Sequence, residues 1–161
     1  MYFWKIDKLK DDIVNNKLTQ KDEFLYVIVW FILFEVALTV SAYTGGDENI
    51  YDTISTFLDI IISLFGIYYA YLKNGANRGK EFLKRYLTIS FVVSIRLIVI
   101  TIPIFFLVSV AVIATEDLTS LNIDNLEDIL VLLYILIANI IYIYLCAKHI
   151  KDVADRTIIS N

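Results

Sequence analysis

The sequence predicts an all-α integral membrane protein: a bundle of four transmembrane helices, preceded by a short N-terminal amphipathic helix at the membrane interface. Three observations predict this class. The chain has 161 residues, of which 58% are hydrophobic, against roughly 45–50% in an ordinary soluble domain, and its mean hydropathy is +0.68. It contains several apolar runs long enough to cross a bilayer. Its charged residues are concentrated between those runs.

The N-terminal region, residues 1–18, has the pattern of an amphipathic helix. Phe3, Ile6, Leu9 and Ile13 recur at helical spacing, with charged residues on the opposite side. Aromatic residues at the start of this region are typical of a segment that lies at a membrane surface. We expect this helix to rest either on the bilayer or on the cytoplasmic face of the protein itself.

The rest of the chain, residues 19–161, is expected to form a single transmembrane domain. Thr19, followed three residues later by Asp22, resembles a capping box that begins the first membrane helix. A span needs about 20 apolar residues, and the third apolar run is longer. We therefore expect that helix to tilt, to kink at Pro103 or to project beyond the bilayer. The four predicted spans are residues 24–43, 54–72, 87–114 and 129–147.

The distribution of basic residues predicts the orientation. Every lysine and arginine except Arg96 lies in one of three segments: residues 1–23, the loop 73–85 or the C-terminal tail 148–161. The other two loops, 44–52 and 116–128, contain acidic residues and no basic ones. Because cytoplasmic loops carry an excess of lysine and arginine, we expect both termini in the cytoplasm and the acidic loops outside. The expected location is the inner membrane of a bacterium.

Each predicted span carries one strongly polar side chain near its middle: Glu35, Asp59, Arg96 and Asn139. At a rise of about 1.5 Å per residue, the two acids lie about 12–13 Å below the outer loops. Counted from the cytoplasmic side, Arg96 lies about 16 Å deep and Asn139 about 13 Å deep. A charge at such a depth costs roughly 2.5–3.5 kcal/mol on insertion scales and needs a partner. We expect Arg96 to pair with Glu35 or Asp59, in the same chain or in a neighbouring copy.

Two interpretations of this intramembrane polar cluster are open. In the structural one, Arg96 bridges an acid, Asn139 forms a hydrogen bond nearby, and the cluster fixes the register of the helices. In the functional one, the same groups line a hydrated path or cavity for ions, protons or a small solute. Because two acids face one arginine, the surplus negative charge requires a proton, a cation or water.

Several function classes are excluded by what the sequence lacks. It contains no H-E-x-x-H, G-x-S-x-G or Walker motif, and one histidine and one cysteine provide no metal-ligand spacing. We therefore expect no enzymatic activity, no cofactor and no metal site, and no binding of nucleic acid. The basic residues of the middle loop are candidates for contact with anionic lipid head groups: Arg78, Lys80, Lys84 and Arg85.

The stretch Phe31–Val36, with the sequence FILFEV, resembles part of the first helix of small multidrug-resistance transporters. In that family a glutamate within the membrane binds protons and cations. The resemblance therefore implies a small proton-coupled transporter that uses Glu35. The resemblance covers about a dozen residues around this stretch, and that family has shorter loops and no charged third helix like the one that carries Arg96.

Three function classes are compatible with the sequence. We favour a homo-oligomeric, channel-like or pore-forming membrane component, such as the effector of a bacterial antiviral defence or toxin system. Four spans without an enzymatic or soluble domain suffice for that role. The first alternative is a membrane binding or immunity protein that acts on a protein partner in the bilayer or at the cytoplasmic face. The second is the proton-coupled transporter. Membrane lipids are expected partners in all three.

Overall fold

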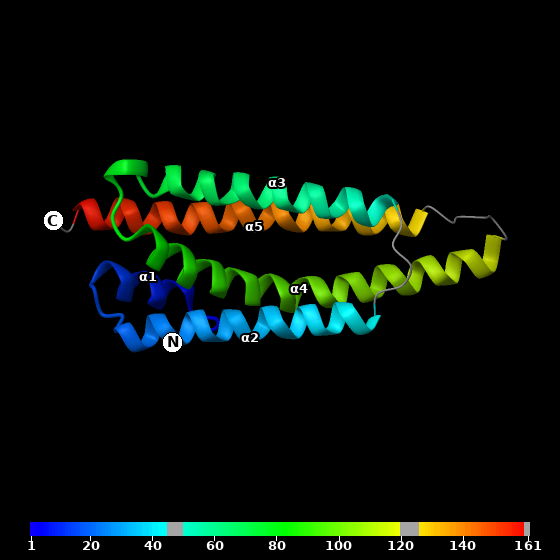
Figure 1. Ribbon diagram of the computed structural model, residues 1–161, viewed down its shortest axis with the longest axis horizontal. Helices are drawn as coiled ribbons and strands as arrows, with labels where there is room; N and C mark the ends of the chain where they lie inside the picture. Colours follow the sequence, from blue (N-terminus) through cyan, green and yellow to red (C-terminus); the bar gives the residue numbers. More distant parts are fainter. Residues whose placement is uncertain (45–49, 120–125, 160–161) are drawn as a thin grey trace.

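The computed structural model describes residues 1–44, 50–119 and 126–159 (Figure 1). This part of the chain contains five α-helices and one short 3-10 turn, and it has no strand. The predicted all-helical fold is confirmed, and each predicted span falls inside one of the four long helices. The elements are α1 (Ile6–Val14), α2 (Gln20–Thr44), α3 (Ile50–Lys73), η1 (Ala76–Arg78), α4 (Phe82–Thr119) and α5 (Leu126–Ile159).

Three of the long helices contain a segment that is long and apolar enough to cross a membrane. These segments are Thr53–Lys73 in α3, Phe82–Val108 in α4 and Ile129–Ile159 in α5. They support the expectation of a membrane protein by their length and composition. Within the described residues α2 is not among them, so the four-span bundle stays a prediction.

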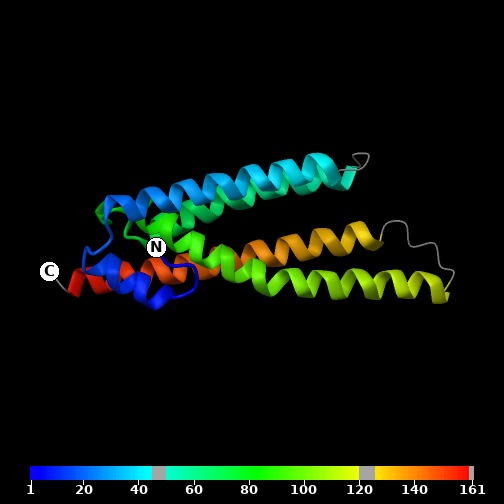
Figure 2. The same cartoon turned by 90° about the horizontal axis from the view of Figure 1, so that it is seen from below.

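The four long helices run side by side along the long axis of the molecule (Figure 1). α3 makes its most extensive contacts with α5, α4 packs against α5, and α2 packs against α4. α4 has 38 residues and continues through Pro103, so it is about 57 Å long. α4 extends past the other helices at one end of the bundle (Figure 2). How it is accommodated in a bilayer, by tilting, kinking or projecting, stays a prediction.

The two ends of the molecule are packed differently. α1, the connection between α3 and α4, and the last turns of α5 lie together at one end (Figures 1 and 2). We call residues 1–26, 70–93 and 146–159 the packed end, and the other described residues the shaft. Among the described residues, every buried hydrophobic side chain belongs to the packed end. The core of this protein therefore sits at one end of a long bundle.

α1 contributes one side of that core. Ile6, Leu9 and Ile13 are each no more than 2% exposed, and α1 contacts α4 and α5. The predicted amphipathic helix thus rests on the helices of the protein itself, which is the second of the two expected alternatives. Its apolar side is covered by protein because the long helices continue past the shaft to meet it.

The shaft has the opposite character, since its surface is apolar. Large hydrophobic side chains on all four of its helices are more than 60% exposed, among them Phe31, Ile61, Phe106, Leu107 and Ile140. A surface of this kind is unfavourable in water and marks contact with lipid or with another protein. The shaft is therefore the part of the molecule suited to the bilayer.

Candidate functional site

The four polar residues that the sequence places in mid-membrane do not form one cluster. Asp59 and Asn139 meet between α3 and α5, where the Asn139 side-chain Nδ2 donates a hydrogen bond of 2.8 Å to Asp59 Oδ1. Both side chains are half-buried. A hydrogen bond between membrane helices contributes roughly 0.6–2 kcal/mol. This pair therefore helps to set the register of α3 against α5, in agreement with part of the structural interpretation.

α3 and α5 also approach each other closely about two turns beyond Asp59. A Cβ atom added at Gly66 of α3 would lie only 2.6 Å from Ile143 Cγ1 of α5, which is closer than real Cβ contacts allow. The absence of a side chain at Gly66 therefore lets α3 and α5 pack closely at this level.

Glu35 points away from the rest of its own chain. The side of α2 that meets α4 is marked by Tyr26, which is fully buried and packs edge-on against Phe91 at a ring-centroid distance of 5.3 Å. Glu35 lies nine residues further along, and at about 100° per residue this places it on the opposite side of α2. Its side chain is exposed. The described residues include no ion pair to Glu35.

Arg96 has a partner that the sequence did not indicate. Its Nε donates a hydrogen bond of 3.0 Å to the Trp4 carbonyl oxygen, its Nη2 donates to the same oxygen, and its guanidinium lies 5.5 Å from the centre of the Trp4 ring. No direct ion pair of Arg96 with Glu35 or Asp59 is found among the described residues, and a contact through one water or with a neighbouring copy stays a prediction.

Helix geometry explains why Arg96 reaches Trp4. Side chains in a helix lean toward its N-terminus, and the N-terminus of α4 lies at the packed end. A long side chain can therefore carry its charge out of the apolar shaft toward the polar end of the molecule, as arginine and lysine do near membrane boundaries. The charge of Arg96 also reaches Asp7 of α1, whose pKa is lowered mainly by its hydrogen bond with Lys10 and to a smaller degree by Arg96.

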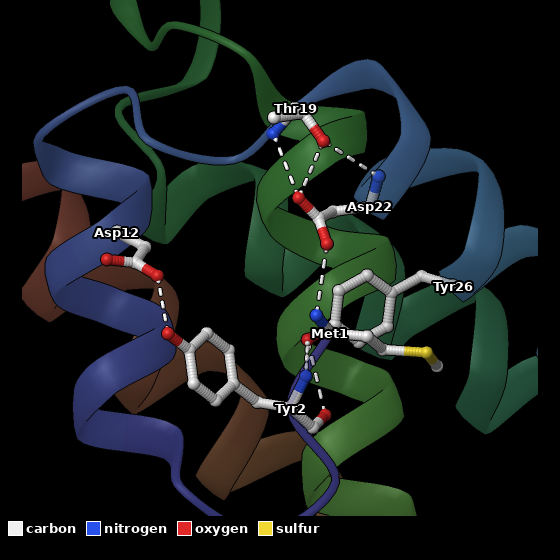
Figure 3. A network of polar contacts seen from close by, with 6 residues as sticks. All are labelled: Met1, Tyr2, Asp12, Thr19, Asp22 and Tyr26. Atoms are coloured by element: carbon white, nitrogen blue, oxygen red, sulfur yellow. Dashed lines mark hydrogen bonds and ion pairs between the residues drawn. The ribbon is translucent and has the colours of Figure 1, made fainter.

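The start of α2 carries the predicted capping box (Figure 3). Thr19 Oγ1 accepts a hydrogen bond of 3.2 Å from the Asp22 N–H and donates one of 2.7 Å to Asp22 Oδ2. The Met1 ammonium group donates to Asp22 Oδ1 at 3.0 Å. The Thr19 hydroxyl and the Met1 ammonium lower the pKa of Asp22 to about 2. The predicted start of the first long helix is thus confirmed, with an added ion pair.

The N-terminal segment is held in place by two tyrosines of the same network (Figure 3). The Tyr2 N–H donates to the Tyr26 hydroxyl at 2.7 Å, and that hydroxyl donates to the Tyr2 carbonyl at 3.2 Å. The Tyr2 hydroxyl donates to the Asp12 carboxylate at 2.6 Å. This segment places the Trp4 carbonyl beside Arg96. In the sequence, the segment is marked by the aromatic residues at positions 2–4, but they do not predict the contact with Arg96.

The four basic residues expected to contact lipid head groups have different surroundings. Arg78 and Lys80 are exposed. Lys84 forms ion pairs with Glu23 at 3.1 Å and with Glu81 at 3.6 Å. Arg85 is only 3% exposed. A direct surface contact with head groups therefore fits Arg78 and Lys80, whereas Arg85 lies beneath the surface.

A cavity of about 500 Å³ lies between α2, α4 and α5. Most of its wall is apolar, and Asn139, Ser94 and Thr101 are among its few polar lining residues. Neither Glu35 nor Asp59 is among the residues that line it. Within one described chain, this cavity therefore does not connect the two acids into a shared polar path.

The described residues contain no group of three or more histidine, cysteine or acidic side chains that could hold a metal ion. The chain matches no protein-family model, no curated protein and no solved structure.

Proposed function

We propose that this chain is a multi-pass protein of the bacterial inner membrane that works as a homo-oligomeric, channel-like component. The observation that carries the proposal is the direction of Glu35. A carboxyl group on an apolar helix, turned away from its own bundle, costs several kcal/mol if it faces lipid. A second copy of the chain would remove that cost by covering the outer side of α2.

Assembly through α2 would also bury apolar surface. Phe31 lies one turn before Glu35 on the outer side of α2, and it is 61% exposed. Packing α2 against α2 would cover this side chain and bring the Glu35 carboxyl groups of several copies around one axis. Such a ring of acids attracts cations, and the acidic loops would raise the cation concentration at its entrance, more strongly at low salt.

The placement of the chain ends supports a four-span topology in which α2 is the remaining span. The N-terminal segment, the connection between α3 and α4, and the C-terminal turns of α5 lie at the same end of the bundle (Figure 1). These are the three segments that hold all the basic residues except Arg96. By the positive-inside rule this end is cytoplasmic. An even number of crossings returns the chain to that side.

The same outward Glu35 also fits a membrane binding or immunity protein, in which a different protein covers α2. Self-association distinguishes that alternative from the channel. A proton-coupled transporter has less support, because its glutamate should face an internal substrate cavity, whereas Glu35 does not line the cavity between α2, α4 and α5.

The oligomeric state tests the proposal. In a Cys146→Ala background, Phe31→Cys should form cross-linked dimers or larger species in lipid nanodiscs. Phe106→Cys is the matched control, because Phe106 is 66% exposed on α4 and should stay uncross-linked. A monomeric mass in lipid together with no cross-link at position 31 would contradict homo-oligomerisation and favour the binding or immunity role.

Ion flux through purified protein in liposomes tests the path itself. We expect cation-selective flux for the wild type and reduced selectivity for Glu35→Gln, because that change removes the charge while keeping the shape. Asp59→Asn should leave the selectivity unchanged, since Asp59 is bonded between α3 and α5. Absence of flux at every voltage and pH, or unchanged selectivity in Glu35→Gln, would refute the channel.

A further inference from the structure

We propose that the packed end holds a binding site for a phosphate-bearing anion, with Arg85 as its buried cation. This site lies apart from the outer side of α2 and does not depend on the channel proposal.

Arg85 is a buried charge with neutral partners. It is 3% exposed, its Nη1 donates to Asn74 Oδ1 at 3.0 Å, and its Nη2 donates to Thr157 Oγ1 at 3.0 Å. Its Nε is buried and has no hydrogen-bond partner. No described carboxylate lies within ion-pair distance of it. Burial lowers the pKa of Arg85, and the more distant Glu81 carboxylate offsets only part of that effect. Because a buried charge is costly unless it is paired, an anion bound beside Arg85 would stabilise it.

A cavity of about 400 Å³ lies beside Arg85. It is formed where the end of α1, the connection between α3 and α4, and the last turns of α5 meet. Its lining includes an exposed lysine, Lys80, and one acid, Glu81, whose carboxylate lies 3.6 Å from the Lys84 ammonium group. The lining residues are Ile13, Val14, Asn16, Lys80, Glu81, Arg85 and Thr157.

The N-terminus of α4 lies beside this cavity, although Phe82, Leu83 and Lys84 are not among the lining residues. α4 begins at Phe82, directly after Glu81 of the cavity wall. The first N–H groups of a helix have no partner within the helix, and the helix dipole favours an anion there. The side chains of the cavity wall supply a guanidinium and an ammonium group, which are donors with which proteins recognise phosphate.

Asn74 links the Arg85 side chain to the backbone of Lys80. Its side-chain Nδ2 donates to the Lys80 carbonyl at 3.2 Å, while its Oδ1 accepts from Arg85. The connection closes tightly over it, because a Cβ atom at Gly79 would lie 2.2 Å from the Asn74 carbonyl oxygen. The site is therefore built before any ligand arrives. The cavity is larger than a bare phosphate, so it also accommodates a lipid head group.

The experiment measures thermal unfolding of the full chain in an uncharged maltoside detergent. Inorganic phosphate should raise the unfolding temperature of the wild type more than chloride of equal ionic strength. Arg85→Gln should weaken the apparent affinity roughly tenfold or more, since a hydrogen bond to a charged group is lost. The exposed Lys80→Gln should weaken it about two- to fivefold. Lys21→Gln, at an exposed lysine of the packed end that does not line the cavity, is the control and should respond like the wild type.

A second arm distinguishes the source of the phosphate. Phosphatidylglycerol is added to the same detergent sample, and retained lipid is counted by native mass spectrometry. Retention that Arg85→Gln abolishes identifies a lipid head group, whereas stabilisation by inorganic phosphate without lipid retention identifies a soluble anion. The proposal is overturned if the wild type responds to phosphate as it does to chloride and retains no lipid, or if Lys80→Gln and Arg85→Gln both respond like the wild type.

Discussion

Along α5, two isoleucines ten residues apart have opposite surroundings: Ile150 is fully buried, whereas Ile140 is 62% exposed. Ile150 belongs to the packed end, where α1 covers the last turns of α5 and the first turns of α4. Ile140 belongs to the shaft, where the same helix leaves its apolar surface open. The comparison shows that apolar composition alone does not make a core, because a membrane helix is equally apolar where lipid takes the place of protein.

Polar contacts also differ between the packed end and the shaft. All ion pairs of the described residues lie in the packed end, where Lys10 contacts both Asp7 and Asp152 at 2.8 Å. Burial alone would lower the pKa of Lys10, but these two carboxylates outweigh it and raise the pKa. In the shaft, helices meet through a glycine contact and the hydrogen bond between Asp59 and Asn139.

The largest expected effect is on the core of the packed end. Ile150→Ala should lower the free energy of unfolding by about 2–5 kcal/mol, because it leaves a cavity in a packed core. Ile140→Ala, on the same helix, should change it by less than about 0.5 kcal/mol in lipid. Both are measured by denaturation in mixed micelles. Equal losses for the two variants would show that Ile140 is covered by protein and not by lipid.

Gly66→Ala should destabilise the contact between α3 and α5 by about 1–3 kcal/mol, since the added methyl group overpacks against Ile143. Ser63→Ala is the control on the same helix, because Ser63 is exposed. A second change, Ile143→Ala, should restore part of the stability lost in Gly66→Ala. A neutral Gly66→Ala would mean that α3 and α5 can separate at this level without cost.

Asn139→Leu should cost roughly 0.6–2 kcal/mol, the range for a hydrogen bond between membrane helices, and it leaves Asp59 without this donor. The double variant Asp59→Leu with Asn139→Leu should recover part of that loss, because neither polar group is then left unpaired. The readout is the same denaturation measurement. A double variant less stable than Asn139→Leu would indicate that Asp59 has a further role in the shaft.

The smallest effect is expected at the start of α2. Asp22→Asn should cost up to about 1 kcal/mol, because it removes the carboxylate that forms a partly exposed ion pair with the Met1 ammonium group. Because the folded-state pKa of Asp22 is about 2, below its ordinary 3.8, its charge stabilises the fold above pH 4 and the contribution is lost as the pH falls toward 2. Wild type and Asp22→Asn should therefore converge in stability over that range, as followed by circular dichroism. A difference between wild type and Asp22→Asn that stays constant down to pH 2 would contradict a stabilising charge at Asp22.

The features that could be predicted from the sequence are those that depend on local patterns. The capping box at Thr19 and Asp22 is set by side chains three residues apart, and the helical spacing of Ile6, Leu9 and Ile13 identifies the side of α1 that is buried. The four long helices follow from apolar length and from the breaks between them. The meeting of Asp59 with Asn139 agrees with their similar depth in neighbouring helices.

The direction of Glu35 and the partner of Arg96 depend on tertiary contacts. α2 is apolar on every side, so its pattern does not reveal which side meets α4, and only the contact of Tyr26 with Phe91 decides that Glu35 faces outward. Arg96 donates to a backbone carbonyl 92 residues away in the sequence. Every residue has a backbone carbonyl, so the sequence does not indicate which one Arg96 contacts. Arg85 is buried for a similar reason, because its partners Asn74 and Thr157 are brought together only when the connection closes over the end of α5.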